Sequence, residues 1–198
     1  MHMKTKRQII SEFRRKEIVD AARSVFARKG FANGIMDDVA KEAKVAKGTL
    51  YLYFRSKTEI YRAVLGHDME LLKKETVERI EAAHGLREKI RAFVLTRLEY
   101  SEQRREFFEI MDAHGGSLSL SRRQYRDWLT EPVQHLAAAI DQAVRQDEIR
   151  TVPSQTVAWI IVEIVRGTIQ RRLLGDTSNS PVQDADFLTD FLWIAIKR

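Results

Sequence analysis

The sequence predicts an all-α protein in which a small N-terminal three-helix unit precedes a larger helical domain. Three observations lead to this class. Apolar residues recur at helical spacing along most of the chain, and no segment alternates apolar and polar residues with a period of two. Two short amphipathic segments also follow one another almost without a linker, in residues 36–57, which is typical of a helix-turn-helix. We expect one domain over residues 1–55 and a second over residues 56–198.

Composition describes an ordinary folded protein. Of 198 residues, 44% are hydrophobic and 31% are charged, which is enough apolar material for a sizeable core. The chain has no cysteine, so disulfides and thiolate metal sites are excluded, in agreement with the reducing cytoplasm where we expect the protein. The longest apolar runs are too short to cross a bilayer, and we expect no membrane partner.

The positive charge is concentrated at the N-terminus. Residues 1–62 hold 15 Lys and Arg against 7 Asp and Glu, whereas residues 63–198 hold 19 against 21. A solvated basic face would be the ordinary explanation of such an excess. Its coincidence with the helix-turn-helix favours a polyanion such as double-stranded DNA as the partner.

Helix boundaries follow from capping and breaking residues. A helix over residues 11–29 ends at Gly30, and two short helices start near Met36 and Ala46. The capping box of Ser56 and Glu59 opens a helix that we expect to stop at about Leu65, before Gly66. Further helices are expected over residues 68–83, 86–103, 105–113, 121–147, 154–174 and 181–197, with Ser180, Pro181 and Gln183 starting the last one.

The second short helix carries the side chains that we expect to meet DNA. Lys47, Thr49, Tyr51 and Tyr53 lie at or near its exposed face. Basic and hydroxylated residues at the start of a helix suit a major groove, where side-chain and backbone donors meet phosphate and base-edge oxygens.

Residues 13–62 resemble the N-terminal domain of the TetR family of bacterial transcriptional regulators. The match rests on the run KGTLYLYFRSK of residues 47–57 and on the residues Ile18, Ala22, Phe26, Gly30, Phe31, Asp38, Val39, Ala40 and Val45. The resemblance implies a homodimeric repressor that binds a palindromic operator and is released by a small-molecule inducer. It also implies that Lys47, Gly48, Thr49, Tyr51, Tyr53 and Lys57 lie at the DNA surface, where Gly48 lets the backbone come close.

Three positions depart from the family pattern. Gly34 and Ile35 stand where the family commonly has a Thr pair that caps a helix and contacts phosphate. Lys44 replaces the usual turn glycine, so we expect a left-handed residue at a cost of about 1 kcal/mol. Either Lys44 reaches phosphate or the strain has no functional return. Ala46 replaces the usual Ser or Thr cap of the second helix, and with Lys44 it completes the predicted DNA site.

Other chemistry finds no support in the sequence. The five histidines lack metal-ligand spacing, and we find no phosphate-binding loop, dinucleotide fingerprint or nucleophile elbow. We therefore predict no catalytic residue, no metal and no cofactor. Two alternatives to a ligand-responsive repressor remain: a helical enzyme or small-molecule-binding protein whose basic face does not bind DNA specifically, and a constitutive architectural DNA binder. An activator is also compatible with the sequence.

The C-terminal domain has more apolar surface than one small core needs. Residues 157–165 (VAWIIVEIV) are apolar nearly all round, and the last helix is apolar over a wide face. We predict that helices 154–174 and 181–197 pair with their symmetry mates in a homodimer, rather than only closing the monomer's core. Gly167 would let the helices approach closely.

A ligand cavity is the second prediction for this domain. Aromatic residues and Met at helical spacing could line an apolar cavity for a small, largely apolar effector, although plain core is the commoner role of such residues. Glu163 and Arg166 lie in the same apolar stretch and need partners if buried, either as an internal or intersubunit salt bridge or as polar anchors in the cavity. The candidate ligand residues are Phe107, Phe108, Met111, Trp128, Trp159, Glu163 and Arg166.

Overall fold

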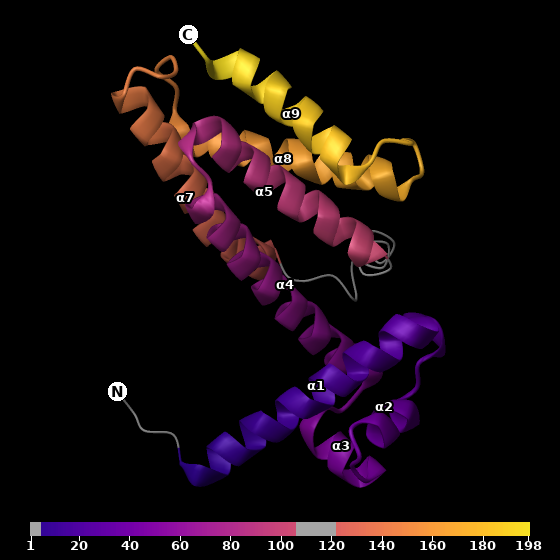
Figure 1. Ribbon diagram of the computed structural model, residues 1–198. Coiled ribbons are helices and arrows are strands. Elements are labelled where there is room, and N and C mark those ends of the chain that lie inside the picture. The colour runs from indigo at the N-terminus through magenta and orange to yellow at the C-terminus, as the bar shows by residue number, and fades with distance from the viewer. Residues whose placement is uncertain (1–4, 106–121) are drawn as a thin grey trace. The chain divides into compact units, whose positions relative to one another are not determined.

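A computed structural model describes residues 5–105 and 122–198, which are helical along most of their length (Figure 1). These residues divide into two compact units, Met1–Asp68 and Met69–Arg198. The helices are α1 (Lys6–Asn33), α2 (Met36–Glu42), α3 (Lys47–Tyr53), α4 (Lys57–Ala82), α5 (Gly85–Gln103), α7 (Arg122–Arg145), α8 (Ser154–Leu173) and α9 (Pro181–Ile196). The all-α fold with an N-terminal helix-turn-helix is confirmed.

The helix α4 corrects one sequence-based expectation. The predicted break at Gly66 is wrong, because α4 continues through it to Ala82. Glycine inside a helix costs about 1 kcal/mol relative to alanine, and here the neighbouring Leu65 and Met69 are both buried and hold the backbone helical. The chain therefore passes from one compact unit to the other within α4. The sequence placed the boundary between the DNA-binding and ligand-binding domains at the start of this helix, and that boundary stays a prediction. The expected helix 105–113 falls almost wholly outside the described residues.

The first unit is built around the C-terminal half of α1. Gly30 has φ +74°, a conformation that favours glycine, and it bends the chain so that Phe31 turns back against Phe26. The rings of Phe26, Phe31 and Tyr61 form a cluster with centroids 4.5–5.9 Å apart, which joins α1 to the first turns of α4. The core below this cluster consists of Ile18, Ala22, Val25, Val39, Leu50, Phe54, Ile60 and Val64.

Gly34 is required by this packing. A Cβ at Gly34 would lie 2.9 Å from Cδ1 of Phe26, closer than real Cβ contacts come. The aromatic ring is buried and cannot move aside, so a larger residue would strain the unit. The departure at Gly34 noted in the sequence therefore has a packing reason.

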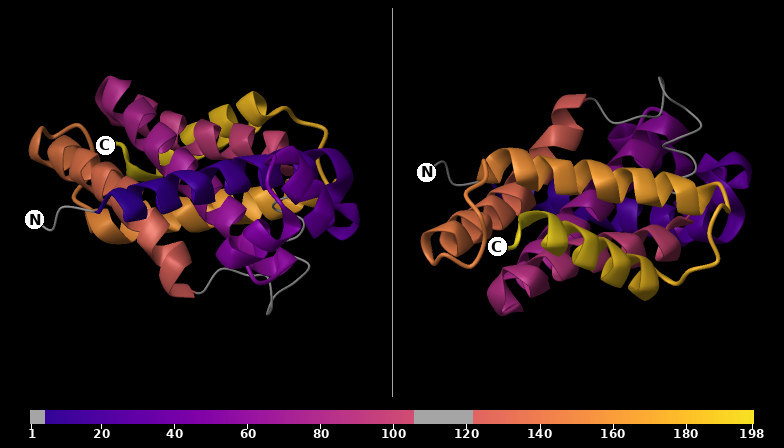
Figure 2. Two further views of the ribbon diagram at one scale, coloured as in Figure 1. Left: turned by 90° about the horizontal axis from the view of Figure 1, so that it is seen from below. Right: turned by 90° about the horizontal axis from the view of Figure 1, so that it is seen from above.

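The second unit is a helical bundle with α5 at its centre. α5 packs most extensively on α9, and also on α7 and α8, and α7 packs against α8 (Figure 2). Its buried core draws on these four helices, with Phe93, Leu136, Ile161 and Leu192 among its members, and on Ile80 of α4. No helix among the described residues is long and apolar enough to cross a membrane.

A buried ionic network fixes the turn from α8 to α9. The Arg172 Nη1 donates to Asp184 Oδ2 at 2.7 Å and to the carbonyl oxygen of Asn179 at 2.8 Å, and Asn179 Nδ2 donates to the other Asp184 oxygen at 2.9 Å. The Asp184 side chain is only 3% exposed and that of Arg172 10%. Because both charges are paired and hydrogen-bonded, the network can lie inside the protein.

Replacing Arg172 by Met should destabilise the fold by about 3–5 kcal/mol, because it leaves the Asp184 carboxylate buried without its principal cation. The measurement is chemical unfolding at one fixed protein concentration. Glu78→Gln, which removes one charge from an exposed pair on α4, should change stability by less than about 0.5 kcal/mol. A loss as small as that of the control would contradict the role of this network.

Candidate nucleic-acid interface

The turn between α2 and α3 is closed by backbone hydrogen bonds around a left-handed lysine. Lys44 has φ +53°, which confirms the expected strained conformation. Its N–H donates to the carbonyl of Lys41, and the N–H of Val45 donates to that of Ala40 at 3.0 Å, the pattern of a helix end with a left-handed residue. The Lys44 side chain is exposed. The turn thus keeps the geometry that a glycine would give, with a cation at its surface.

Neither short helix has a side-chain cap from its N-cap residue. Ala46, which precedes α3, cannot accept a hydrogen bond, as the sequence predicted. Ile35, which precedes α2, is compensated from within the helix, since Asp38 Oδ2 accepts from the Ile35 N–H at 3.3 Å. The hydrogen bond from Lys29, at 2.8 Å, and that from Ile35 lower the pKa of Asp38.

The two faces of α3 differ sharply. Leu50 and the following Phe54 are fully buried and anchor the helix. Of the predicted DNA-site residues, Lys44, Ala46, Lys47, Gly48 and Tyr51 are exposed, and Thr49, Tyr53 and Lys57 are partly buried. A Cβ at Gly48 would meet nothing within 4 Å, so the surface beside it is open to a close approach.

Sequence reasoning missed Leu52. This side chain is 84% exposed, between Tyr51 and Tyr53 on α3. Its place two residues after the buried Leu50, on the opposite side of a helix, was the signal that could have revealed it. An exposed leucine beside cations and hydroxyls adds an apolar group to this surface.

Lys47 at the start of α3 forms an ion pair across the helix-turn-helix. Its Nζ lies 2.7 Å from Oδ1 of Asp37, in the first turn of α2, and both side chains are more than half exposed. The hydrogen bond to Asp37 and the charge of Asp37 raise the pKa of Lys47. The ammonium is therefore firmly charged and held at the surface that α2 and α3 share.

Lys57 makes an internal contact. Its ammonium donates to the carbonyl oxygen of Ala32 at 2.9 Å and lies 4.5 Å from the ring centroid of Phe31. Burial lowers the pKa of Lys57. A cation suits the C-terminal end of α1, where carbonyls lack helical partners, so Lys57 joins α4 to α1.

The predicted ligand residues do not gather at one described site. Phe107, Phe108 and Met111 lie outside the described residues. Trp128 lines a cavity of about 20 Å³ near Met69 and Leu129, and Trp159 packs against the core. Glu163 and Arg166 form an ion pair, one of the two roles expected for them, in which Arg166 Nε donates to Glu163 Oε2 at 2.8 Å. Both side chains are 52% exposed on α8, so the pair lies outside the core of this chain.

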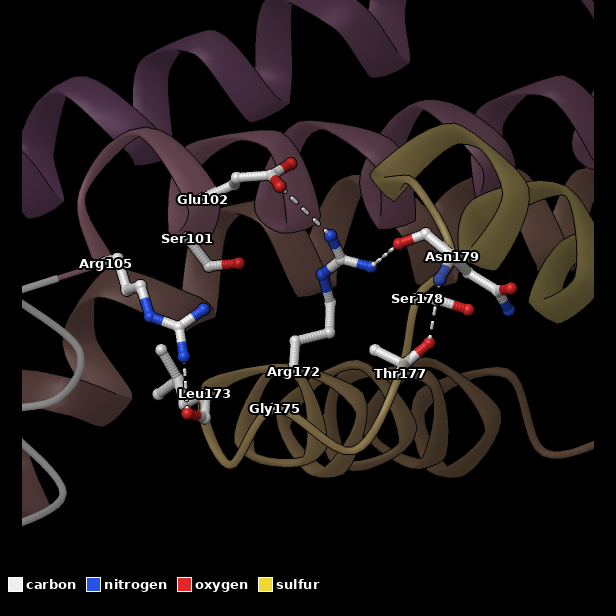
Figure 3. Close-up of a pocket in the computed structure, with 9 residues that line it drawn as sticks. All are labelled: Ser101, Glu102, Arg105, Arg172, Leu173, Gly175, Thr177, Ser178 and Asn179. Atoms are coloured by element: carbon white, nitrogen blue, oxygen red, sulfur yellow. Dashed lines mark hydrogen bonds and ion pairs between the residues drawn. The ribbon is translucent and has the colours of Figure 1, made fainter.

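A polar pocket of about 220 Å³ lies where the ends of α5 and α8 meet the loop to α9 (Figure 3). Ser101, Glu102, Arg105, Arg172, Leu173, Gly175, Thr177, Ser178 and Asn179 line it. Its guanidinium groups are engaged within the protein: Arg105 donates to the Leu173 carbonyl at 2.6 Å, and Arg172 belongs to the network with Asp184. No group of acidic or histidine side chains suited to a metal ion occurs in residues 5–105 and 122–198.

Comparison with known proteins gives the class. The family described as "Bacterial regulatory proteins, tetR family" matches residues 18–64, which include α2, α3 and the start of α4. The chain is 30% identical over 103 residues to the helix-turn-helix transcriptional regulator TtgW of Pseudomonas putida, itself uncharacterised, and the match covers 51% of this chain and 74% of TtgW. The protein belongs to the TetR family of bacterial transcriptional regulators. It is a DNA-binding regulator and not an enzyme.

Solved structures share the fold over nearly the whole chain. FadR of Bacillus subtilis, solved in complex with stearoyl-CoA, matches 89% of this chain and 96% of its own with a TM-score of 0.68 at 21% identity. AibR, solved in complex with isovaleryl coenzyme A and operator DNA, matches 90% of this chain and 97% of its own with a TM-score of 0.61 at 20% identity. The architecture of both units is thus that of known regulators.

Replacing Lys57 by Met should lower the stability of the first unit by roughly 1–2 kcal/mol, because the hydrogen bond to Ala32 and the cation–π contact with Phe31 are lost. Thermal unfolding followed by circular dichroism measures this loss. Lys16→Met, at an exposed position of α1, should have little effect and serves as the control. Equal melting curves for the two variants would show that the Lys57 contact does not hold α4 to α1.

Proposed function

We propose that the protein is a ligand-responsive repressor that binds a palindromic operator as a homodimer through α3 and leaves it when a small molecule binds the second unit. The observation that carries this proposal is the exposed face of α3, on which Lys47, Gly48 and Tyr51 stand beside the left-handed Lys44. A cation, an open backbone and a hydroxyl on one short helix suit a major groove, where phosphates position the helix and base edges are read.

The exposed Leu52 gives this surface an apolar reader. The major groove presents one apolar base group, the C5-methyl of thymine, and an isobutyl side chain matches it. We infer that Leu52 contacts a thymine in the operator. Replacing that thymine by uracil should lower the operator affinity of the wild type but not that of Leu52→Ala. An equal loss of affinity in both proteins would contradict a contact between Leu52 and the thymine methyl group.

Dimerisation through α8 and α9 is supported by their outer faces. On α9, Ala185, Leu188 and Leu192 face the core, while Phe187, Phe191 and Ile194 are 58–68% exposed at i, i+4 and i+7 spacing. The rings of Phe187 and Phe191 stack with centroids 6.5 Å apart. One apolar side of α9 packs on the chain's own core, and the other is exposed and available to a partner. We propose that this partner is a second copy of the chain.

Gly167 supports the same interface. It lies on the exposed face of α8, near the Glu163–Arg166 pair, and a Cβ there would meet nothing within 4 Å. None of the described residues thus requires a glycine here, and a glycine costs helix stability. A closely packed helix from a second copy would require one, and would also enclose the Glu163–Arg166 pair.

The effector that we propose to test first is an acyl-coenzyme A. Two solved proteins of the same fold, FadR and AibR, were crystallised with such thioesters. An acyl chain is the largely apolar ligand that the sequence favours. Binding of the effector would favour a conformation in which the two α3 helices no longer stand one DNA turn, about 34 Å, apart. This change would pass through α4, because α4 connects the two units.

Lys47→Ala should weaken operator binding up to about eightfold at 0.1 M salt, and lower the slope of log K against log salt by about 0.9, because one phosphate contact is lost. Tyr51→Phe should weaken operator binding without changing that slope. The readout is fluorescence anisotropy at several salt concentrations, with Lys74→Ala on the second unit as a charge-matched control. Wild-type affinity in Lys47→Ala would count against α3 as the DNA-binding element.

Phe191→Glu should raise the dimer dissociation constant roughly 30-fold or more, since a buried aromatic anchor contributes about 2 kcal/mol or more to an interface. Gly167→Gln should weaken the dimer while leaving the helix at least as stable. Sedimentation equilibrium measures both, with Leu71→Gln on exposed α4 surface as the control. A wild-type monomer at micromolar concentration, or an unchanged dimer in both variants, would refute this interface.

A further inference from the structure

Two adjacent carboxylates in the first turn of α2 have different surroundings. Asp38 is partly buried and is engaged by the Ile35 N–H and by the Lys29 ammonium, so its charge serves the fold of the first unit. Asp37 is 55% exposed, and it forms an ion pair with Lys47 of α3, at 2.7 Å. The carboxylate of Asp38 therefore stabilises the fold of the first unit, whereas the carboxylate of Asp37 is engaged in an ion pair at the surface.

The pair of Asp37 and Lys47 stands on the DNA-facing surface. Lys47 is the first residue of α3, whose exposed face we have assigned to the major groove, and a carboxylate 2.7 Å from its ammonium lies on the same surface. A second exposed ion pair in this unit, Arg28 with Glu42 at 2.8 Å, joins α1 to the end of α2 and has no partner on α3 among its described contacts. The two pairs have similar geometry and differ in their relation to α3.

A carboxylate at this place opposes indiscriminate DNA binding. DNA phosphates compete with Asp37 for the Lys47 ammonium. When a phosphate binds this ammonium, the Asp37 carboxylate is left unpaired and faces a polyanion within the Debye length, about 10 Å at 0.1 M salt. Any duplex offers phosphates, so the penalty applies to every sequence. This electrostatic penalty is offset where a base edge donates a hydrogen bond to the Asp37 carboxylate. In the major groove, the cytosine N4 amino group is such a donor.

We propose that Asp37 is a specificity-determining residue: it holds Lys47 away from the phosphates of non-cognate DNA and releases it where the operator offers a base-edge donor to the carboxylate. This inference rests on the proposed function, because it requires α3 to be the element that meets DNA. It assigns the protein's preference for its operator partly to a repulsive group, which lowers affinity for all other sequences.

The test is a double-mutant cycle on a duplex of random sequence. Asp37→Asn removes the competing charge, so non-specific affinity should rise up to about eightfold at 0.1 M salt, with the salt slope steeper by about 0.9, as for one added phosphate contact. In a Lys47→Gln background the same substitution should gain less than half of that. Glu42→Gln, which removes the same charge from the Arg28 pair, should change affinity less than twofold.

A second arm measures specificity. Duplexes selected by the wild type from a random library give the operator sequence, and the ratio of operator to random-duplex affinity should fall several-fold in Asp37→Asn. An Asp37→Ser variant checks that the effect follows the charge and not the amide, and circular dichroism checks that each variant folds.

Three results would overturn the proposal: unchanged or weaker random-duplex binding in Asp37→Asn, an equal gain in the Lys47→Gln background, or a specificity ratio that does not fall. Failure of the proposed function would look different. The wild type would then show no salt-dependent duplex binding at all, and the cycle would have no starting value.

Discussion

The ring of Phe26 supports the whole DNA-binding unit. It packs against Phe31, which Gly30 turns back towards it, and against Tyr61 of α4, while Gly34 leaves the space that the ring fills. Since α2 begins two residues after Gly34 and Tyr61 lies in the first turns of α4, which follows α3 after three residues, this cluster holds both ends of the helix-turn-helix. The placement of α3, which carries Lys47 and Tyr51 on its exposed face, therefore depends on this aromatic packing.

The charged side chains of the first unit are of two kinds: some make contacts within the unit, and others stay at its surface. Lys57 binds the Ala32 carbonyl and the Phe31 ring, and Asp38 binds the Lys29 ammonium and the Ile35 N–H, all within the unit. Lys44 and Lys47 stay at the surface. The basic excess of residues 1–62 is thus partly structural, and the charge that meets DNA is smaller than the sequence count suggests.

The sequence was informative where local chemistry decides the structure. The left-handed Lys44, the uncapped Ala46 and the Ser180–Gln183 capping box follow from short-range geometry, and all three were predicted correctly. Gly30 does interrupt the helical backbone, but the expected helix over residues 11–29 begins earlier, at Lys6, and α1 runs on to Asn33. The sequence was uninformative where distant residues decide. The continuity of α4 through Gly66 depends on buried neighbours, the contacts of Lys57 and Asp37 depend on how helices pack, and an all-apolar α8 does not reveal which side faces the chain's own core. The exposure of Glu163 and Arg166 could therefore not be predicted from the sequence.

The central claim, that a homodimer places two α3 helices in successive major grooves, is tested most directly by hydroxyl-radical footprinting of the wild-type protein on a duplex selected from a random library. The account predicts two protected half-sites related by two-fold symmetry, with centres about 10 base pairs or a multiple of that apart. A single protected half-site, or uniform protection without symmetry, would contradict it.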